Sequence, residues 1–550
     1  MCKYCFVKLK QWWPWLGYFL IFSLSFIIFL YILAPPGIIG PDSFYHTKMA
    51  LMIKEQGLVN NFPWLQFTTY KDLFVDHHFG YHYLLTMFLS LPTPQNLDIF
   101  SAEIDPLIKT KLATAFFAAL VFVFMYWFLR SLKVKIPLFW VLIGLLLAPF
   151  LTRLSFIRAP AISLIILILG FYFILNKKYL ALFILSFIYV WMYGTWPLML
   201  ITVVLYALAR TFKSIINNQR SIILNFFKQL FSLINLKLFA SCILGLSAGL
   251  IINPYFPKTL PFYWFQTIKI AILNYQNKIN IGAEWYSYEP SALFINLLPI
   301  LILWIISLAW FAVKIKKQKT VHWFLMILSV FFLISTFESR RNVEYFIPPA
   351  IFFSALIFSQ ISQKINWPKL KQQFQHYFSG SQNIFYFMLT IFFILFAGFF
   401  LVFYLNFSIK NLQNAYQQKA RPINHLQMAS HWLKNNTEAE KIIFQSNWDI
   451  FPELFFFNTR NYYINGLDQT FMYEKNKDLY QTWSDLFFNK TDPHKTAQIL
   501  AEKFKATYVL VDKKDKNFAK LIKKSTSLKK VYEDYEAIIY KNMFLVEQNS

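Results

Sequence analysis

Residues 15–46 read WLGYFLIFSLSFIIFLYILAPPGIIGPDSFYH and decide the fold. The first part, residues 15–33, carries no charged side chain and is long enough to cross a bilayer as a helix. The second part ends in Gly40-Pro41-Asp42-Ser43-Phe44-Tyr45-His46, which places an acid and a histidine just beyond the apolar run. The stretch therefore predicts a membrane helix that is followed by a polar segment whose side chains could take part in catalysis.

The composition of the whole chain supports a membrane protein. Of the 550 residues, 57% are hydrophobic and only 15% are charged, whereas soluble domains carry about 25% charged residues. The formal net charge is +26. Positive loops on the cytoplasmic side explain this excess. Nucleic-acid binding would need a soluble basic face, and the sequence contains none, so we expect no nucleic-acid partner.

Eleven apolar runs recur along the chain, and we predict one membrane span for each. The predicted spans cover residues 15–33, 111–129, 137–151, 160–175, 179–193, 196–209, 238–253, 291–313, 321–337, 345–361 and 384–406. With a cytoplasmic N-terminus, all the basic loops fall on the cytoplasmic side: 130–135, 177–178, 210–237, 314–319 and 363–376. We predict a multi-pass protein of the cell (cytoplasmic) membrane.

The extracytoplasmic side then holds a large first loop, residues 34–110, and the tail, residues 407–550. Charges become frequent in the tail, where alternating patterns predict strands near 441–447, 461–465, 507–511 and 536–541 and helices near 422–434, 477–488, 494–504 and 515–524. We predict two domains: a transmembrane domain, 1–406, and an extracytoplasmic α/β domain, 407–550. The predicted fold class is an α-helical polytopic membrane protein with this C-terminal domain.

The first outer loop contains candidate catalytic residues. Asp42 and His46 are four residues apart, so a helix that begins at Pro41 or Asp42 would place them on one face. A carboxylate in this position can accept a proton from a substrate. The structural alternative is that Asp42 caps a helix over residues 43–55.

A second cluster follows in the same loop and consists of Asp76, His77, His78 and His82. Histidine and aspartate gathered at one membrane face suit a divalent metal or acid–base chemistry. We predict Asp76 as a catalytic residue, and Asp42, His77 and His78 as ligands of a possible Mg²⁺ or Mn²⁺ ion. The alternative is a polar interfacial hairpin.

Four arginines lie in short outer turns, against the positive-inside trend: Arg153, Arg158, Arg340 and Arg341. Arginine makes two-pronged contacts with phosphate that lysine does not, so we predict that these four bind a phosphate group. Pairing of Glu344 with Arg340 or Arg341 is the alternative.

Two further sites depend on single acids. Glu284 lies in the outer loop before the eighth span and is a candidate catalytic residue. Trp448 and Asp449 follow the first predicted strand of the tail, a position that suits ligand contact, and we predict that they bind the acceptor. A helix cap by Asp449 is the alternative. The chain has no phosphate-binding glycine loop and no serine nucleophile motif, which argues against an ATP-driven pump or a hydrolase.

Three of these segments together resemble one superfamily. DSFYHTK at 42–48, IGAEW at 281–285, and SNWD at 446–449 with NTR at 458–460 are similar to motifs of the multi-spanning C-type glycosyltransferases. The pattern is closest to the catalytic subunit of oligosaccharyltransferases. The turn where that family has a second acidic motif reads RLSFIRAP at 153–160 and lacks an acid. We therefore expect a member of the superfamily rather than an enzyme of protein N-glycosylation.

The resemblance implies an integral-membrane glycosyltransferase of the hexosyl- or oligosaccharyl-transferase type. Its donor would be a polyprenyl-(pyro)phosphate-linked sugar or oligosaccharide. The acceptor would be a glycan, lipid or protein on the extracytoplasmic face. Two alternatives remain: a flippase for polyprenyl-linked sugars without transferase activity, and a scaffold whose tail binds cell-wall components.

Overall fold

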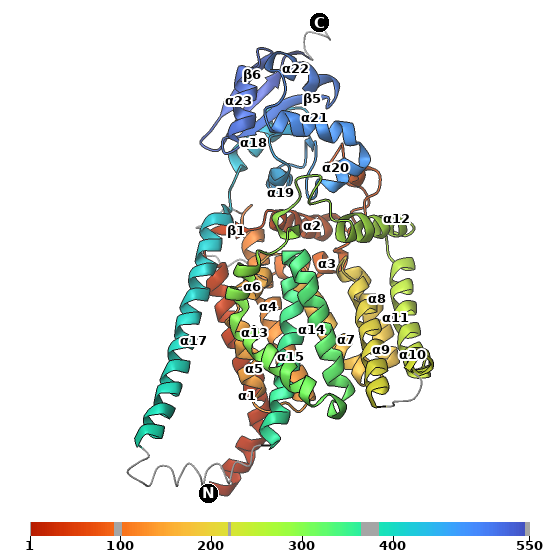
Figure 1. The fold of residues 1–550 in the computed structure, drawn as a ribbon. Coiled ribbons are helices and arrows are strands. Elements are labelled where there is room, and N and C mark those ends of the chain that lie inside the picture. Colours follow the sequence, from red (N-terminus) through yellow and green to blue (C-terminus); the bar gives the residue numbers. More distant parts are fainter. Residues whose placement is uncertain (1, 93–101, 218–221, 365–383, 545–550) are drawn as a thin grey trace.

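A computed structural model describes residues 2–92, 102–217, 222–364 and 384–544. The molecule is elongated: a helical bundle carries the C-terminal sheet region at one end, and the N-terminus lies at the other (Figure 1). Short helices lie across the junction between these two parts. The chain is a multi-pass membrane protein, and the predicted fold class is confirmed.

Ten of the eleven predicted spans each fall on one helix, and the remaining span, 137–151, falls on two. The helices at the predicted spans are α1 (Cys2–Leu33), α4 (Asp105–Ser131), α5 (Pro137–Leu145), α6 (Ala148–Leu154), α7 (Pro160–Leu175), α8 (Tyr179–Met192), α9 (Pro197–Asn217), α11 (Leu233–Ile251), α13 (Pro290–Val313), α14 (Thr320–Glu338), α15 (Val343–Lys364) and α17 (Ile384–Lys419). Among the described residues, seven helices are long and apolar enough to span a membrane, and the shorter α7 and α8 are also apolar.

One predicted span, residues 137–151, is not a straight helix. It breaks into α5 and α6, which are bent by 78° and would together form an eighth span. Pro149 explains the break, because its nitrogen cannot donate the hydrogen bond that would continue α5. The bend directs α6, which contains Arg153, and the turn after it, which contains Arg158, toward the junction.

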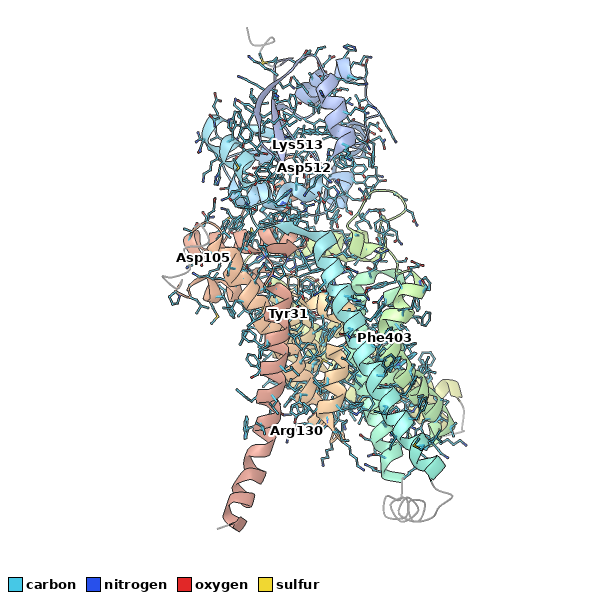
Figure 2. All side chains as sticks on the ribbon, turned by 90° about the vertical axis from the view of Figure 1, so that its left-hand side faces the viewer. Tyr31, Asp105, Arg130, Phe403, Asp512 and Lys513 are labelled. Atoms are coloured by element: carbon cyan, nitrogen blue, oxygen red, sulfur yellow. The ribbon has the colours of Figure 1, made fainter. Side chains whose placement is uncertain are left out.

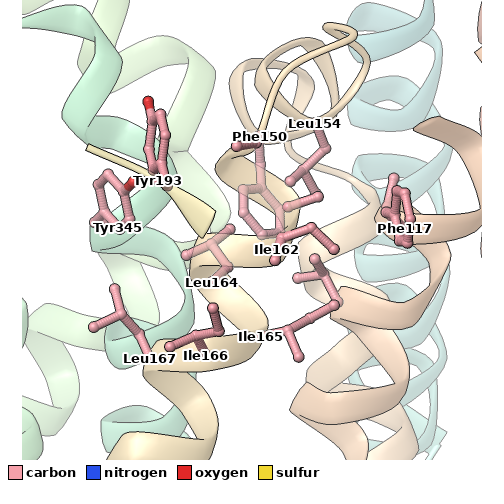
Figure 3. Close-up of a cluster of buried hydrophobic side chains, with 14 of the residues drawn as sticks. Phe117, Phe150, Leu154, Ile162, Leu164, Ile165, Ile166, Leu167, Tyr193 and Tyr345 are labelled. Carbon is pink, nitrogen blue, oxygen red and sulfur yellow. The ribbon is translucent and has the colours of Figure 1, made fainter. Parts of the chain in front are cut away.

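The centre of the bundle is tightly packed around α7. Figure 3 shows side chains of α7 against Phe117 of α4 and against Phe150 and Leu154 of α6. Nearly all of α7 is apolar and buried, as expected of a helix that is enclosed on every side. Helix α1 instead exposes large side chains such as Tyr31 (65%), and α17 exposes Phe403 (57%), so these helices present apolar faces to lipid (Figure 2).

Short elements lie mainly at the two ends of the bundle. They are α2 (Asp42–Gln56), η1 (Thr69–Lys71), α3 (Phe79–Leu89), α10 (Ile222–Leu230), α12 (Thr259–Trp264), the π-helix η2 (Phe265–Ile272), η3 (Ala283–Trp285), η4 (Ile315–Lys317) and η5 (Arg340–Asn342). Helices α2 and α12 lie under the C-terminal region (Figure 1). Helix α2 begins at Asp42, but the Asp42 side chain forms no cap hydrogen bond, so the capping alternative is wrong.

The C-terminal region contains a five-stranded sheet in the order β4-β3-β5-β7-β6. Its strands are β3 (Ile442–Gln445), β4 (Tyr462–Tyr463), β5 (Ala506–Asp512), β6 (Leu528–Glu533) and β7 (Ala537–Asn542). Its helices are α18 (Gln427–Asn436), η7 (Trp448–Ile450), α19 (Phe451–Phe457), α20 (Thr470–Lys475), α21 (Lys477–Phe487), α22 (Pro493–Glu502) and α23 (Lys516–Lys524). Strands β3, β4 and β5 are parallel, whereas β7 runs antiparallel to β5 and β6.

Two pairings connect the first outer loop to the C-terminal region. Strand β1 (Gly37–Ile39), directly after α1, pairs antiparallel with β2 (Ala420–Pro422), directly after α17. Further along the loop, Leu65 bridges Tyr463, and Gln66 donates its backbone N–H to the Tyr463 carbonyl. Backbone hydrogen bonds therefore hold α2 between the bundle and the sheet.

Candidate active site

A cavity of about 660 Å³ lies where the bundle meets the C-terminal region. This volume is within the usual range for small-molecule sites. The cavity is lined from α2, the turns after α6 and α8, the segment 266–285, η5 and the C-terminal region. Of the sequence-predicted site residues, Asp42, His46, His77, His78, Arg158, Glu284 and Arg341 line it.

A chain of ion pairs crosses one wall of the cavity. Arg158 donates to Asp42 at 2.6 Å and to Glu284 at 2.7 Å. Arg153 donates to the same oxygen of Glu284 at 2.6 Å and to the fully buried Glu344 at 2.7 Å. Acids and bases therefore alternate along residues that are far apart in sequence. The expected pairing of Glu344 with Arg340 or Arg341 is replaced by pairing with Arg153.

The ion pairs set the charge states of the two acids at the cavity. Burial acts to raise the pKa of Glu284, but the guanidinium groups of Arg158 and Arg153 hold it well below its usual range. The pKa of Asp42 is raised by burial, and Arg158 only partly opposes this effect. Glu284 is thus firmly ionised, whereas Asp42 is the more basic carboxylate of the two.

Arg341 differs from the other arginines at the cavity. It donates to the Tyr193 hydroxyl at 2.8 Å and lies 4.2 Å from the centre of the Trp285 ring. Within the described part of the chain it forms no ion pair. Its neighbour Arg340 donates to the Ser287 carbonyl, is exposed, and does not line the cavity. Arg341 is therefore a cation that faces the cavity and is available to an anionic ligand.

The histidines of the first outer loop gather beside Asp42. His46 Nδ1 lies 2.8 Å from His82 Nε2, and His82 Nδ1 lies 2.7 Å from Asp76 Oδ2. Asp76 is buried behind these rings, so this predicted catalytic residue does not line the cavity. Burial lowers the pKa of His46 well below its usual value and that of His77 to about 4, which keeps both rings neutral.

Several buried polar atoms around the cavity have no hydrogen-bond partner among the described residues. They include Tyr45 Oη, His77 Nδ1, His78 Nδ1, Gln266 Oε1 and Asn274 Oδ1. Each of these residues also lines the cavity. A buried polar group without a partner destabilises a protein by about 1–3 kcal/mol. Such a concentration of unpaired groups is typical of a site that binds a polar ligand.

The predicted metal ligands do not form a metal site. No group of three histidine, cysteine, aspartate or glutamate side chains within the described ranges is arranged to hold an ion. Asp42 is bound by Arg158 instead, and the His77 and His78 rings pack against each other with their centres 3.9 Å apart. The side chains present therefore do not fit a divalent cation, and Arg158 supplies the positive charge between Asp42 and Glu284.

The predicted acceptor-binding pair lies beside the cavity rather than in its wall. The Asp449 carboxylate accepts a hydrogen bond from Arg421 at 2.6 Å, and the same arginine binds Glu453. Trp448 lies against Gly282, two residues before Glu284. Asp449 does not cap α19; Asn447 accepts from the Asp449 N–H instead. Trp448 thus supports the segment that carries Glu284, and its predicted role as an acceptor ligand stays a prediction.

Sequence reasoning missed several residues of the cavity wall. Asp468 reaches it from the C-terminal region, in the turn after β4, and burial raises the pKa of its carboxyl group. Tyr193 and Gln266 line the cavity from two other turns. The Gly466-Leu467-Asp468 turn after a strand was a usable signal for Asp468. Tyr193 had none, because it lies at the end of an apolar helix.

The fold is that of the C-type glycosyltransferases. No protein-family model and no curated protein matches the chain. The solved structures that are similar to it include the following two. One is the archaeal oligosaccharyltransferase AglB from Archaeoglobus fulgidus, with an inhibitory peptide and a dolichol-phosphate (TM-score 0.61, 13% identity, 97% of this chain and 74% of that one). The other is ArnT from Cupriavidus metallidurans bound to undecaprenyl phosphate (TM-score 0.53, 12% identity, 96% and 98%).

These likenesses extend over nearly the whole chain, including the C-terminal region. Both similar proteins are multi-span glycosyltransferases of the C type. The resemblance inferred from the three short motifs is therefore confirmed at the level of the fold.

Proposed function

We propose that this protein is an integral-membrane glycosyltransferase. It moves a sugar or oligosaccharide from a polyprenyl-(pyro)phosphate donor to an acceptor on the extracytoplasmic face. The observation that supports this most strongly is the cavity of about 660 Å³ at the junction, whose wall contains the carboxylates of Asp42 and Glu284 together with Arg158 and Arg341. We assign the carboxylates to contact with the acceptor and Arg341 to contact with the phosphate leaving group.

Arg341 is the proposed main phosphate ligand. It has no carboxylate partner of its own among the described residues, so phosphate would supply the missing anion. Negative charge grows on the phosphate oxygen as the glycosidic bond breaks, and a nearby guanidinium stabilises that charge. Arg158 already binds Asp42 and Glu284, and we assign it to holding these acids in position. Arg153 also holds Glu284 in position, and it is itself bound to the buried Glu344.

We further propose that the end of the bundle opposite the sheet is cytoplasmic. Arg130 lies toward that end, far from Asp512 and Lys513 in the C-terminal region (Figure 2). Residues at the other basic loops contact one another: Lys213 contacts Thr320, and Lys364 lies over the Trp310 ring. Positive loops favour the cytoplasmic side. The tail, residues 407–550, is then an extracytoplasmic domain. Helix α17 continues to Lys419, past the predicted domain boundary at residue 407, and that boundary stays a prediction.

A donor assay tests the proposed function. Purified protein in lipid vesicles is incubated with undecaprenyl-phosphate glucose, mannose and N-acetylglucosamine. Each donor is offered a serine/threonine peptide, an Asn-x-Thr peptide and a short oligosaccharide as acceptors. The proposal expects release of undecaprenyl phosphate from at least one donor. Movement of the intact donor across the bilayer with no release from any donor would contradict the transferase and support a flippase.

A further inference from the structure

Three buried side chains beside the cavity form a linear hydrogen-bonded series. Asp76 accepts from His82 Nδ1 at 2.7 Å, and His82 Nε2 lies 2.8 Å from His46 Nδ1. Asp76, His82 and His46 are only 1%, 0% and 3% exposed. His46 is the member that lines the cavity. The series therefore runs from the protein interior to the ligand space.

The order of the groups fixes the position of each proton. The Asp76 carboxylate can only accept, so His82 carries its proton on Nδ1. In this tautomer the Nε2 atom of His82 is an acceptor, and His46 donates to it from Nδ1. This leaves a lone pair on His46 Nε2, which forms no hydrogen bond within the described part of the chain. An oriented imidazole with a free lone pair is the arrangement of a general base.

We propose that His46 is the general base of the reaction for an acceptor hydroxyl, and that His82 and Asp76 are positioning residues that set its tautomer. This inference depends on the proposed glycosyltransferase function. The general base is then His46 and not Asp42, because the Asp42 carboxylate is bound to Arg158. Asp42 lies one helical turn before His46 on the same face of α2, and its role is then to orient the acceptor.

The proposed step balances in protons and electrons. The acceptor O–H bond breaks, and its proton goes to His46 Nε2. The acceptor oxygen forms a bond to the anomeric carbon as the bond from that carbon to the phosphate oxygen breaks. The bonding electron pair leaves with the phosphate. The positive charge on the His46–His82 pair is stabilised by the Asp76 carboxylate, and the proton returns to water after the product leaves.

Neighbouring side chains keep the His46 ring in this arrangement. Tyr45 and His78 pack edge-on against it, with ring centres 5.3 and 4.8 Å away. Tyr45 also packs edge-on against His82, with ring centres 5.9 Å apart. The ring is thus held in place without another hydrogen bond to occupy Nε2.

The test uses the full-length protein and the donor assay described above, with water or the best hydroxyl acceptor. His46→Ala should lower kcat by about 10²- to 10³-fold, the usual contribution of a general base, while KM for the donor changes less than about threefold. Added imidazole should restore at least a tenth of the lost rate. His494→Ala, on the exposed surface of α22, is the matched control and should leave kcat unchanged.

Two substitutions of His82 test the positioning role separately. His82→Gln can place its amide oxygen where Nε2 lies and still accept from His46, so it should keep kcat within about tenfold of the wild type. His82→Leu removes the acceptor and should lower kcat by about 10²-fold. Equal loss in both variants, or a His46→Ala enzyme with more than half of the wild-type kcat, would overturn the proposal. An inactive wild type would instead contradict the glycosyltransferase function itself.

Discussion

The ion pair between Arg158 and Asp42 allows a quantitative test of the site. In Arg158→Gln, Asp42 loses its ion-pair partner, whereas Glu284 keeps Arg153 at 2.6 Å. Removing one member of a buried pair destabilises a protein by about 3–5 kcal/mol. The Asp42 and Arg158 side chains are 26% and 15% exposed, so the lower value of about 3 kcal/mol applies.

This free energy corresponds to a measurable change in melting temperature. An unfolding entropy of about 2.1 cal/mol/K per residue gives about 1.2 kcal/mol/K for a chain of this length. Arg158→Gln should therefore lower the melting temperature by about 3 °C, which can be followed by tryptophan fluorescence in detergent. Asp72→Asn removes a surface ion pair with Lys475 in which the Asp72 side chain is 68% exposed, and it should change the melting temperature by less than about 0.5 °C.

The double variant separates an ion pair from two independent losses. Asp42→Asn alone should lower the melting temperature by about 1 °C, because Arg158 keeps its contact with Glu284. In the Arg158→Gln background the same change removes an unpaired buried charge and should raise the melting temperature by about 1 °C. Two effects that simply add, with Asp42→Asn harmful in both backgrounds, would refute the proposed ion pair.

Three other outcomes follow from the site. Arg341→Ala should raise KM for the lipid-phosphate donor by about tenfold or more, with Arg341→Lys intermediate, since a charged hydrogen bond contributes about 1.5–3 kcal/mol; an unchanged KM would exclude Arg341 as phosphate ligand. Treatment with EDTA should leave donor turnover within about twofold, because Arg158 lies where a cation would neutralise Asp42 and Glu284; loss of turnover that Mg²⁺ or Mn²⁺ restores would contradict this. Stability should fall as the pH drops from about 6.5 to 4, because unfolding lets His77 bind a proton that its folded-state pKa of about 4 prevents. That single group contributes about 3 kcal/mol, and His77→Gln should flatten the pH dependence of the melting temperature.

Much of the architecture could be predicted because apolar runs are a local signal. Every predicted span except 137–151 falls on a single helix, and the four predicted strands of the tail overlap β3, β4, β5 and β7. Strand β6 was missed because it is a Lys-rich edge strand, LKKVYE, and lacks the apolar pattern of an internal strand. The bend between α5 and α6 was missed because the run remains apolar across it.

The site was harder to predict because its contacts are long-range. Arg153 and Glu344 are 191 positions apart, and no local pattern links them. Their residue types were sufficient to mark them as unusual at a membrane surface, but not to pair them. The same holds for His46 and His82, which lie on two different helices. Which of these side chains contact substrate stays a prediction. The predicted basic loop 363–376 also stays a prediction, because its residues from 365 onward lie outside the described residues.

The most direct measurement of the central claim is the release of undecaprenyl phosphate from an undecaprenyl-phosphate sugar by the reconstituted protein. The account predicts release by the wild type and a loss of about 10²-fold in Asp42→Asn, because the cavity carboxylate can no longer orient the acceptor. Equal release by both proteins would contradict the role of the cavity. No release by the wild type with any donor would contradict the glycosyltransferase.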